Sequence, residues 1–304
     1  MIMSINASSR ATGVGFLAIL LWSGLALLTA LTAGIPPFEL LALSFGVAFA
    51  ASLVVLGRRG AAGFRAWRQP WPVWACGFAG IFFYHALYFF ALKAAPPVEA
   101  SLINYLWPLL IVVFSALVAR EALQARQVAG AMLGLAGTAV VLLTREQGGA
   151  GGADPLAGYA AAAAGALVWS LYSVNNRRFK DVPGEVMGGI CGLVAAAGLA
   201  CHLLFETWVM PSLAGWAAIV ALGLGPTGLA FFAWDHATKH GRLALLGVLS
   251  YFAPLLSTAL LILSGQAPAR PAVLVSALLI IGGAALASLK STASAAPEAS
   301  PESP

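Results

Sequence analysis

Aromatic and hydrogen-bonding side chains recur at helical spacing inside long apolar stretches of this sequence. Tyr84 and Tyr88 lie four residues apart and would share one helical face, as would Ser101 and Tyr105. A hydroxyl, amide or indole N–H buried in lipid needs a partner, so such groups should point into the protein. The whole set is Tyr84, His85, Tyr88, Ser101, Asn104, Tyr105, Trp107 and Trp169. Aromatic walls with a few hydrogen-bonding groups predict a binding cavity for a partly apolar, partly polar solute.

The chemistry of this set favours binding over catalysis. None of its members carries a fixed charge, so a strongly ionic solute fits poorly, whereas a zwitterion with an aromatic side chain fits. Hydrogen bonding between helices without any ligand is the alternative role for each residue. The sequence has no Walker loop, no HExxH and no Gly-x-Ser-x-Gly, and its three cysteines lack metal-ligand spacing. We therefore expect no catalytic residue, no metal site and no cofactor.

Few ionisable residues fall within the apolar stretches. Glu39 and Glu185 lie in the expected first turns of two helices, where a helix N-terminus favours negative charge. His85 is either a proton site or a satisfied hydrogen-bond donor. Glu39 and His85 are thus the candidates for proton coupling, and the driving force stays open. A further group at an expected turn is predicted to be a solvated charge cluster: Asp235, His236, Lys239, His240 and Arg242.

The elements that must position these side chains are membrane-spanning helices. The chain has 304 residues, of which 61% are hydrophobic and 9% charged, where a soluble domain carries about a quarter charged residues. The predicted fold class is an all-α integral membrane protein with ten transmembrane helices. The stretches long enough to cross about 30 Å of hydrocarbon are 13–33, 37–56, 73–92, 97–119, 127–144, 155–176, 183–205, 213–235, 243–264 and 271–289.

Basic residues predict the orientation of these helices. With the N-terminus in the cytoplasm, 13 of the 16 lysines and arginines lie on the inner side, and only Lys93, Arg145 and Arg270 lie outside. Residues 1–12 are then a cytoplasmic segment, 145–154 a periplasmic linker and 290–304 a disordered cytoplasmic tail. Both termini are predicted to be cytoplasmic. No basic face or recognition motif points to nucleic acid as a partner.

The sequence repeats itself at an offset of 146 residues. Residues 105–110 read Tyr-Leu-Trp-Pro-Leu-Leu, and residues 251–256 read Tyr-Phe-Ala-Pro-Leu-Leu. With a one-residue slip, Trp22-Ser23 aligns with Trp169-Ser170. Agreement in register across several helices indicates two related halves.

Each half, 13–144 and 155–289, holds five predicted spans. Because five is odd, the second half must enter the membrane in the opposite sense to the first. Inverted repeats of this kind are typical of secondary transporters, whose substrate site lies near the midplane between the halves. Pro108 and Pro254 occupy matching helices and are either structural kinks or bending points for gating. Glycine ridges, such as Gly188 with Gly192, indicate close helix packing within the chain or between protomers.

Ten spans in two inverted halves, with Ala100-Ser-Leu-Ile103 leading into Tyr105-Leu-Trp-Pro-Leu-Leu110, resemble the drug/metabolite transporter superfamily of EamA type. Within it, the sequence is similar to the YddG-type aromatic amino-acid exporters, on the residues Tyr84-His85, Tyr88, Asn104 to Pro108 and Trp169. The resemblance implies export of Phe, Tyr and Trp, with other amino acids and lipophilic cations, across a bacterial inner membrane by alternating access.

Several alternatives remain at this point. Another small metabolite, such as threonine, homoserine, a nucleobase or a toxic cation, is the first. An intramembrane enzyme or a channel is the alternative from another class. The expected partners are a small-molecule substrate and the lipid bilayer, and the oligomeric state is not predicted.

Overall fold

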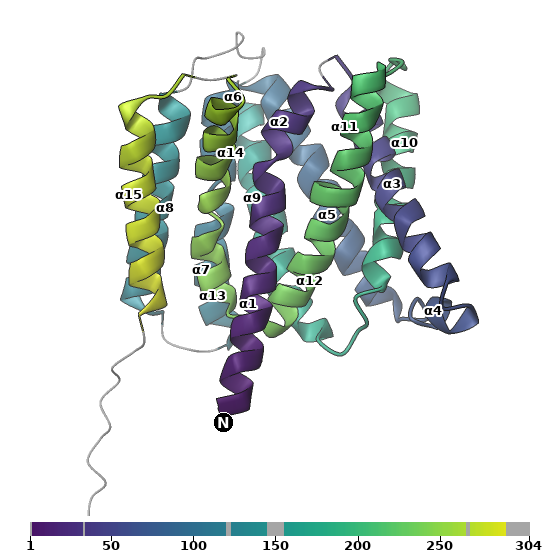
Figure 1. Cartoon of the computed structure of the whole chain (residues 1–304), viewed down its shortest axis with the longest axis horizontal. Helices are drawn as coiled ribbons and strands as arrows, with labels where there is room; N and C mark the ends of the chain where they lie inside the picture. The colour runs from purple at the N-terminus through teal and green to yellow at the C-terminus, as the bar shows by residue number, and fades with distance from the viewer. Residues whose placement is uncertain (1, 33, 120–122, 145–154, 266–267, 290–304) are drawn as a thin grey trace, which may run out of the picture.

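The computed structural model of the chain describes residues 2–32, 34–119, 123–144, 155–265 and 268–289, and these ranges are almost entirely helical (Figure 1). The predicted linker 145–154 and tail 290–304 lie outside the described residues. The helices are α1 (Ile2–Ser23), α2 (Leu25–Ala30), α3 (Pro37–Gly57), α4 (Ala61–Arg65), α5 (Trp71–Ala94), α6 (Pro97–Asn104), α7 (Trp107–Ala119), α8 (Ala125–Leu143), α9 (Pro155–Asn175), η1 (Asn176–Phe179), α10 (Val186–Phe205), α11 (Leu213–Leu224), η2 (Gly225–Leu229), α12 (Ala230–His240), α13 (Leu243–Leu249), α14 (Phe252–Leu263) and α15 (Pro271–Ser288).

The helices confirm the predicted membrane fold. Within the described ranges, nine segments are long and apolar enough to cross a membrane. The tenth helix of the prediction is α8, which has 19 residues and packs along α15. The ends differ from the predicted ones by a few residues: the first span begins at Ala7, and the eighth continues to His240.

The two halves run in opposite senses. Thr12 near the start of α1 accepts a hydrogen bond from the backbone N–H of Arg242, just beyond the end of α12. At the other end of the pair, Trp22 Nε1 donates to the carbonyl oxygen of Pro226. Helix α1 is therefore antiparallel to α12. The repeat maps α1 onto α9 and α5 onto α11–α12, so the packing of α5 on α9 repeats that of α12 on α1.

Helices that are equivalent by the repeat also pack on each other. α3 contacts α10 at one end of the molecule, and α8 contacts α15 at the other (Figure 1). The predicted glycine ridges lie in such contacts: an added Cβ would meet Ser52 of α3 at Gly188, and Phe49 of α3 at Gly192. The ridge on α10 thus serves packing within the chain.

Both proline-bearing spans are broken into two helices. α6 ends at Asn104 and α7 begins at Trp107, so Pro108 lies in the first turn of α7. In the second half, α13 ends at Leu249 and α14 begins at Phe252, which places Pro254 in the first turn of α14. A proline is tolerated in a first turn because the N–H that it lacks has no helical partner there. The eighth span is interrupted by the π-helix η2, which contains Pro226.

Candidate substrate-binding cavity

A cavity of about 420 Å³ lies between the two halves of the bundle. Its walls come from α1, α2, α3, α5, α6, α7 and α8 of the first half and from α9, α11, η2, α12 and α14 of the second. All eight residues that the sequence singled out for binding are among those that line it: Tyr84, His85, Tyr88, Ser101, Asn104, Tyr105, Trp107 and Trp169. Pro254 also lines the cavity, whereas Pro108 and Glu39 are not among its lining residues.

Hydrogen bonds hold the polar wall of the cavity between α5 and α6. The Tyr88 hydroxyl and Ser101 Oγ are 3.0 Å apart, and Asn104 Nδ2 donates to the Tyr84 hydroxyl at 3.1 Å. His85 Nδ1 lies 2.7 Å from the carbonyl oxygen of Ile81, one turn back on its own helix, and donates to it. Asn104 Oδ1 is buried and has no hydrogen-bond partner in the described part of the chain. The wall therefore combines satisfied hydroxyls with one spare acceptor.

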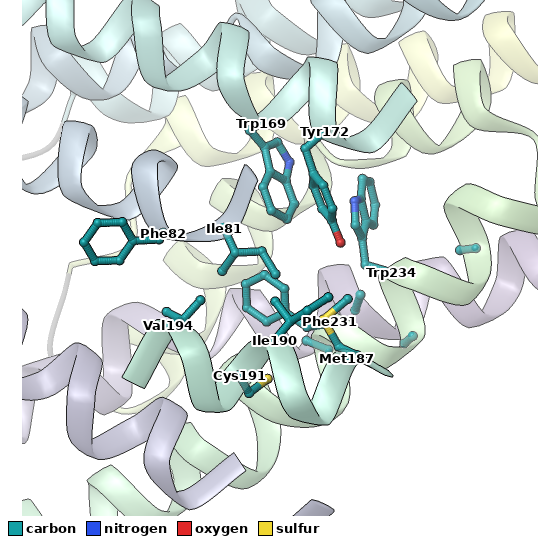
Figure 2. Close-up of a cluster of buried hydrophobic side chains, with 14 of the residues drawn as sticks. Ile81, Phe82, Trp169, Tyr172, Met187, Ile190, Cys191, Val194, Phe231 and Trp234 are labelled. Carbon is teal, nitrogen blue, oxygen red and sulfur yellow. The ribbon is translucent and has the colours of Figure 1, made fainter. Parts of the chain in front are cut away.

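Trp169 lies at the centre of the aromatic wall. Its ring centroid is 5.2 Å from that of Tyr84, 5.7 Å from that of Trp22 and 6.2 Å from that of Trp107. Trp169 projects from α9 beside Tyr172 toward Phe231 and Trp234 of α12 (Figure 2). Aromatic pairs at these separations stabilise one another beyond their burial, so the rings form a rigid surface.

Residues related by the internal repeat meet at the cavity. The offset of 146 maps His85 onto Phe231, and the two ring centroids are 6.1 Å apart. Trp22 and Trp169, which match with the one-residue slip, are 5.7 Å apart. The pseudo-two-fold axis thus passes through the aromatic wall. Phe231 was missed from the sequence, although its position opposite His85 in the repeat was a usable signal.

The cavity lies toward one side of the membrane. Thr29, Leu40, Leu92 and Leu142 line it, and each belongs to a helix end at the face opposite the start of α1. We call the face at which α1 begins the N-terminal face. Between the cavity and the N-terminal face, the bundle is filled by buried side chains, among them Trp234.

The predicted solvated cluster at the end of α12 is wrong for two of its members. Asp235 is 5% exposed and Lys239 6% exposed, while His236, His240 and Arg242 are exposed as predicted. Asp235 and Lys239 share one face of α12 at i,i+4 spacing. That face turns inward, against η1 and the segment before α10, because the last turns of α12 pack there rather than at the surface.

Glu39 is buried at the start of α3, next to the cavity-lining Leu40 but not itself among the lining residues. Its Oε2 accepts a hydrogen bond from the backbone N–H of Val209, and Oε1 has no partner among the described residues. The N-terminus of α3 is capped by Glu206, whose carboxylate accepts the N–H groups of Phe38 and Glu39. The sequence placed Glu39 correctly in a first turn and missed Glu206, because no local signal links residues 167 positions apart. In the described ranges no group of three His, Cys, Asp or Glu is placed to hold a metal ion.

Known proteins share this architecture. The model of the EamA-like transporter family matches the chain twice, at residues 10–143 and 156–289. The chain therefore belongs to the EamA-like transporter family, and it is a transporter rather than an enzyme. A solved crystal structure that is 51% identical covers 92% of this chain and 96% of its own, with a TM-score of 0.87.

Within this family the chain is of the YddG type. It is 53% identical over 282 residues to the aromatic amino acid exporter YddG of Ancylobacter novellus. The aligned region covers 92% of this chain and 98% of that relative. The YddG exporter of Escherichia coli K12 is 29% identical over 209 residues, covering 62% of this chain and 66% of its own. The molecule is thus a multi-pass membrane exporter with a small-molecule substrate.

Proposed function

We propose that this protein exports aromatic amino acids, namely Phe, Tyr and Trp, across the bacterial inner membrane by alternating access. Other amino acids and lipophilic cations are secondary solutes. The observation that carries the proposal is the cavity of about 420 Å³ with aromatic walls at the meeting of two inverted halves. Pockets of this size class bury small organic ligands, and the similar YddG proteins are named as exporters of aromatic amino acids.

The proposed site separates apolar from polar contacts. Trp169, Trp107, Tyr84, Tyr88 and Tyr105 present ring surface to an aromatic side chain. A second group, His85, Ser101 and Asn104, offers hydrogen-bonding atoms to the amino-acid backbone, with Asn104 Oδ1 as the spare acceptor. Burying an amino or carboxyl group without hydrogen bonds costs several kcal/mol, about 2–7 for a neutral polar group, so these contacts are needed for binding.

The symmetry of the halves supports the proposal of alternating access. Related packings, open to either face, have similar energies when two inverted repeats interchange their roles. Pro108 and Pro254, which begin the second helix of each broken span, are the proposed bending points. With both termini in the cytoplasm, as the basic residues predict, the cavity described above faces the periplasm. His85 lies in the path and Glu39 beside it, and these are the proposed positions for any proton coupling.

Purified protein in liposomes tests the proposal. Radiolabelled Trp or Phe should move in a protein-dependent and saturable manner, and each should inhibit the flux of the other. Selective movement of threonine, a nucleobase or a toxic cation would replace the substrate assignment and leave the transporter class intact. Flux that rises linearly with concentration would indicate a channel. Repeating the assay with and without a pH gradient shows whether protons are coupled to export.

A further inference from the structure

A buried ion pair lies between the aromatic wall and the N-terminal face. Lys239 Nζ donates to Asp235 Oδ2 at 2.8 Å and to the carbonyl oxygen of Val182 at 3.2 Å. Asn176 Nδ2 donates to Asp235 Oδ1 at 2.9 Å. The pair therefore ties α12 to the start of η1 and to the segment before α10. Burying two charges costs several kcal/mol per ion unless their pairing offsets it, so stability alone is a weak reason for such a pair.

A small hollow adjoins this pair. Its volume is about 10 Å³, close to the space of one water molecule, and its lining includes Asp235, Lys239, Asn176 and Tyr172. The Tyr172 hydroxyl is buried and has no hydrogen-bond partner among the described residues. Tyr172 neighbours Trp169, whose ring centroid is 5.4 Å away (Figure 2). The hollow therefore lies next to the wall of the large cavity. The Tyr172 hydroxyl, which has no partner among the described residues, thus lies beside two side chains of opposite charge, Asp235 and Lys239.

The large cavity lacks the charged side chains that line this hollow. No Asp, Glu, Lys or Arg is among the described residues that line it. An amino acid carries an ammonium and a carboxylate on one carbon, and an ionised group that leaves water needs a charged or hydrogen-bonding partner. Opposite charges next to each other, with a free hydroxyl beside them, match that pattern.

We propose that Asp235, Lys239 and Tyr172 form a second binding site, for the ammonium and carboxylate of a zwitterionic amino acid that arrives from the N-terminal face. The proposal rests on the proposed function. When this face opens, the ammonium group of the substrate pairs with Asp235. The carboxylate of the substrate pairs with Lys239 and accepts a hydrogen bond from the Tyr172 hydroxyl. When the face is closed and empty, the two side chains neutralise each other. The substrate thus replaces a charge pair that already exists and leaves no ion unpaired.

The internal repeat does not duplicate this charge pair at the opposite face. The offset of 146 places Phe89 opposite Asp235 and Lys93 opposite Lys239. Phe89 lines the large cavity, and Lys93 is exposed. The equivalent position at the opposite face therefore lacks the carboxylate, and the repeat does not duplicate the Asp235–Lys239 pair there.

Solutes that lack one charge test the site. Tryptophan, tryptamine and indole-3-propionate share the indole ring and differ in the ammonium and carboxylate. Each is applied to the N-terminal face of oriented liposomes, and its half-saturation or inhibition constant is measured. In D235N the constants of tryptophan and tryptamine should rise roughly tenfold or more, as expected for a lost hydrogen bond to a charged group. The constant of indole-3-propionate, which has no ammonium, should not change. In K239Q the tryptophan and indole-3-propionate constants should rise and that of tryptamine should stay.

Two further variants keep the test decisive. Y172F removes only a hydroxyl, so it should fold even where the charge variants do not. It should weaken the binding of tryptophan and indole-3-propionate, which carry a carboxylate, and leave the binding of tryptamine unchanged. E185Q breaks the exposed Arg59–Glu185 ion pair on the same face and should leave all three constants unchanged. Equal changes in the constants of all three solutes would indicate that Asp235 and Lys239 only hold the N-terminal face closed, and would overturn the proposed binding site. Absence of tryptophan flux in the unaltered protein, with another solute moving, would instead show that the proposed function has failed, and this site with it.

Discussion

The close approach of α5 and α9 can be tested at Gly80. A Cβ added at Gly80 would lie 2.5 Å from Tyr172 Cβ, a separation that real Cβ atoms essentially never show. Tyr172 is 4% exposed and packs against Trp169, and the hollow beside it holds only about 10 Å³, so its ring has little space to move into. Gly80→Ala must therefore push the two helices apart or distort the tyrosine.

The size of the effect follows from two opposing terms. Overpacking a close-packed interior costs about 1–3 kcal/mol, while replacing glycine by alanine inside a helix gains about 0.5–1 kcal/mol. Gly46→Ala in α3 provides the matched control, because among the described residues no atom outside the adjoining helix backbone lies within 4 Å of an added Cβ there. The helix gain is common to both variants, so their difference isolates the clash. We expect Gly80→Ala to be less stable than Gly46→Ala by about 1–3 kcal/mol.

Equilibrium unfolding in mixed micelles measures that difference, and tryptophan binding gives a second measurement. Tyr84 follows Gly80 by one turn, and Trp169 precedes Tyr172 by one turn, so a splayed pair of helices displaces both walls of the cavity. Gly80→Ala should therefore weaken tryptophan binding, while Gly46→Ala should not. Equal stability of the two variants, with unchanged binding in both, would refute the packing of α5 on α9.

Three other changes have defined outcomes. Glu206→Ala leaves two backbone N–H groups at the start of α3 without their acceptor and should destabilise the protein by about 1–3 kcal/mol, against at most about 1 kcal/mol for Glu185→Ala, whose side chain is 33% exposed; equal losses in the unfolding assay would contradict the cap. Trp169→Ala should cost about 3–5 kcal/mol and abolish tryptophan binding, with Trp169→Phe intermediate; wild-type affinity by isothermal titration would exclude the ring from the site. In a cysteine-free background, Thr29→Cys should react quickly with a membrane-impermeant thiol reagent and the buried Ser173→Cys slowly; the reverse order would place the opening at the other face.

The helices and the cavity wall were largely predictable from the sequence. Apolar runs of about 20 residues can only be satisfied as helices in lipid, because every backbone polar group needs an internal partner. The same rule turned the hydroxyls and amides of α5 and α6 inward, which is why Tyr84, Tyr88, Ser101 and Asn104 lie on one cavity. The length of an apolar run and the helical spacing of polar residues within it are local properties of the sequence, so each could be predicted from a single stretch.

The charged groups were less predictable, because their surroundings depend on distant segments. Asp235 and Lys239 look exposed when the end of α12 is considered by itself. They are buried because Asn176 and Val182, about 60 residues earlier in the chain, close over them. Glu206 caps α3 from the far end of α10 in the same way. Such contacts need the packing of the two halves, which hydropathy does not specify.

The most direct test of the central claim is a crystal structure with bound 5-bromotryptophan, whose bromine is located by its anomalous scattering. The account predicts a single strong bromine peak inside the cavity between the two halves, beside Trp169 and within contact of Tyr84. A fully occupied bromine site elsewhere on the protein, with this cavity empty at saturating ligand, would contradict it.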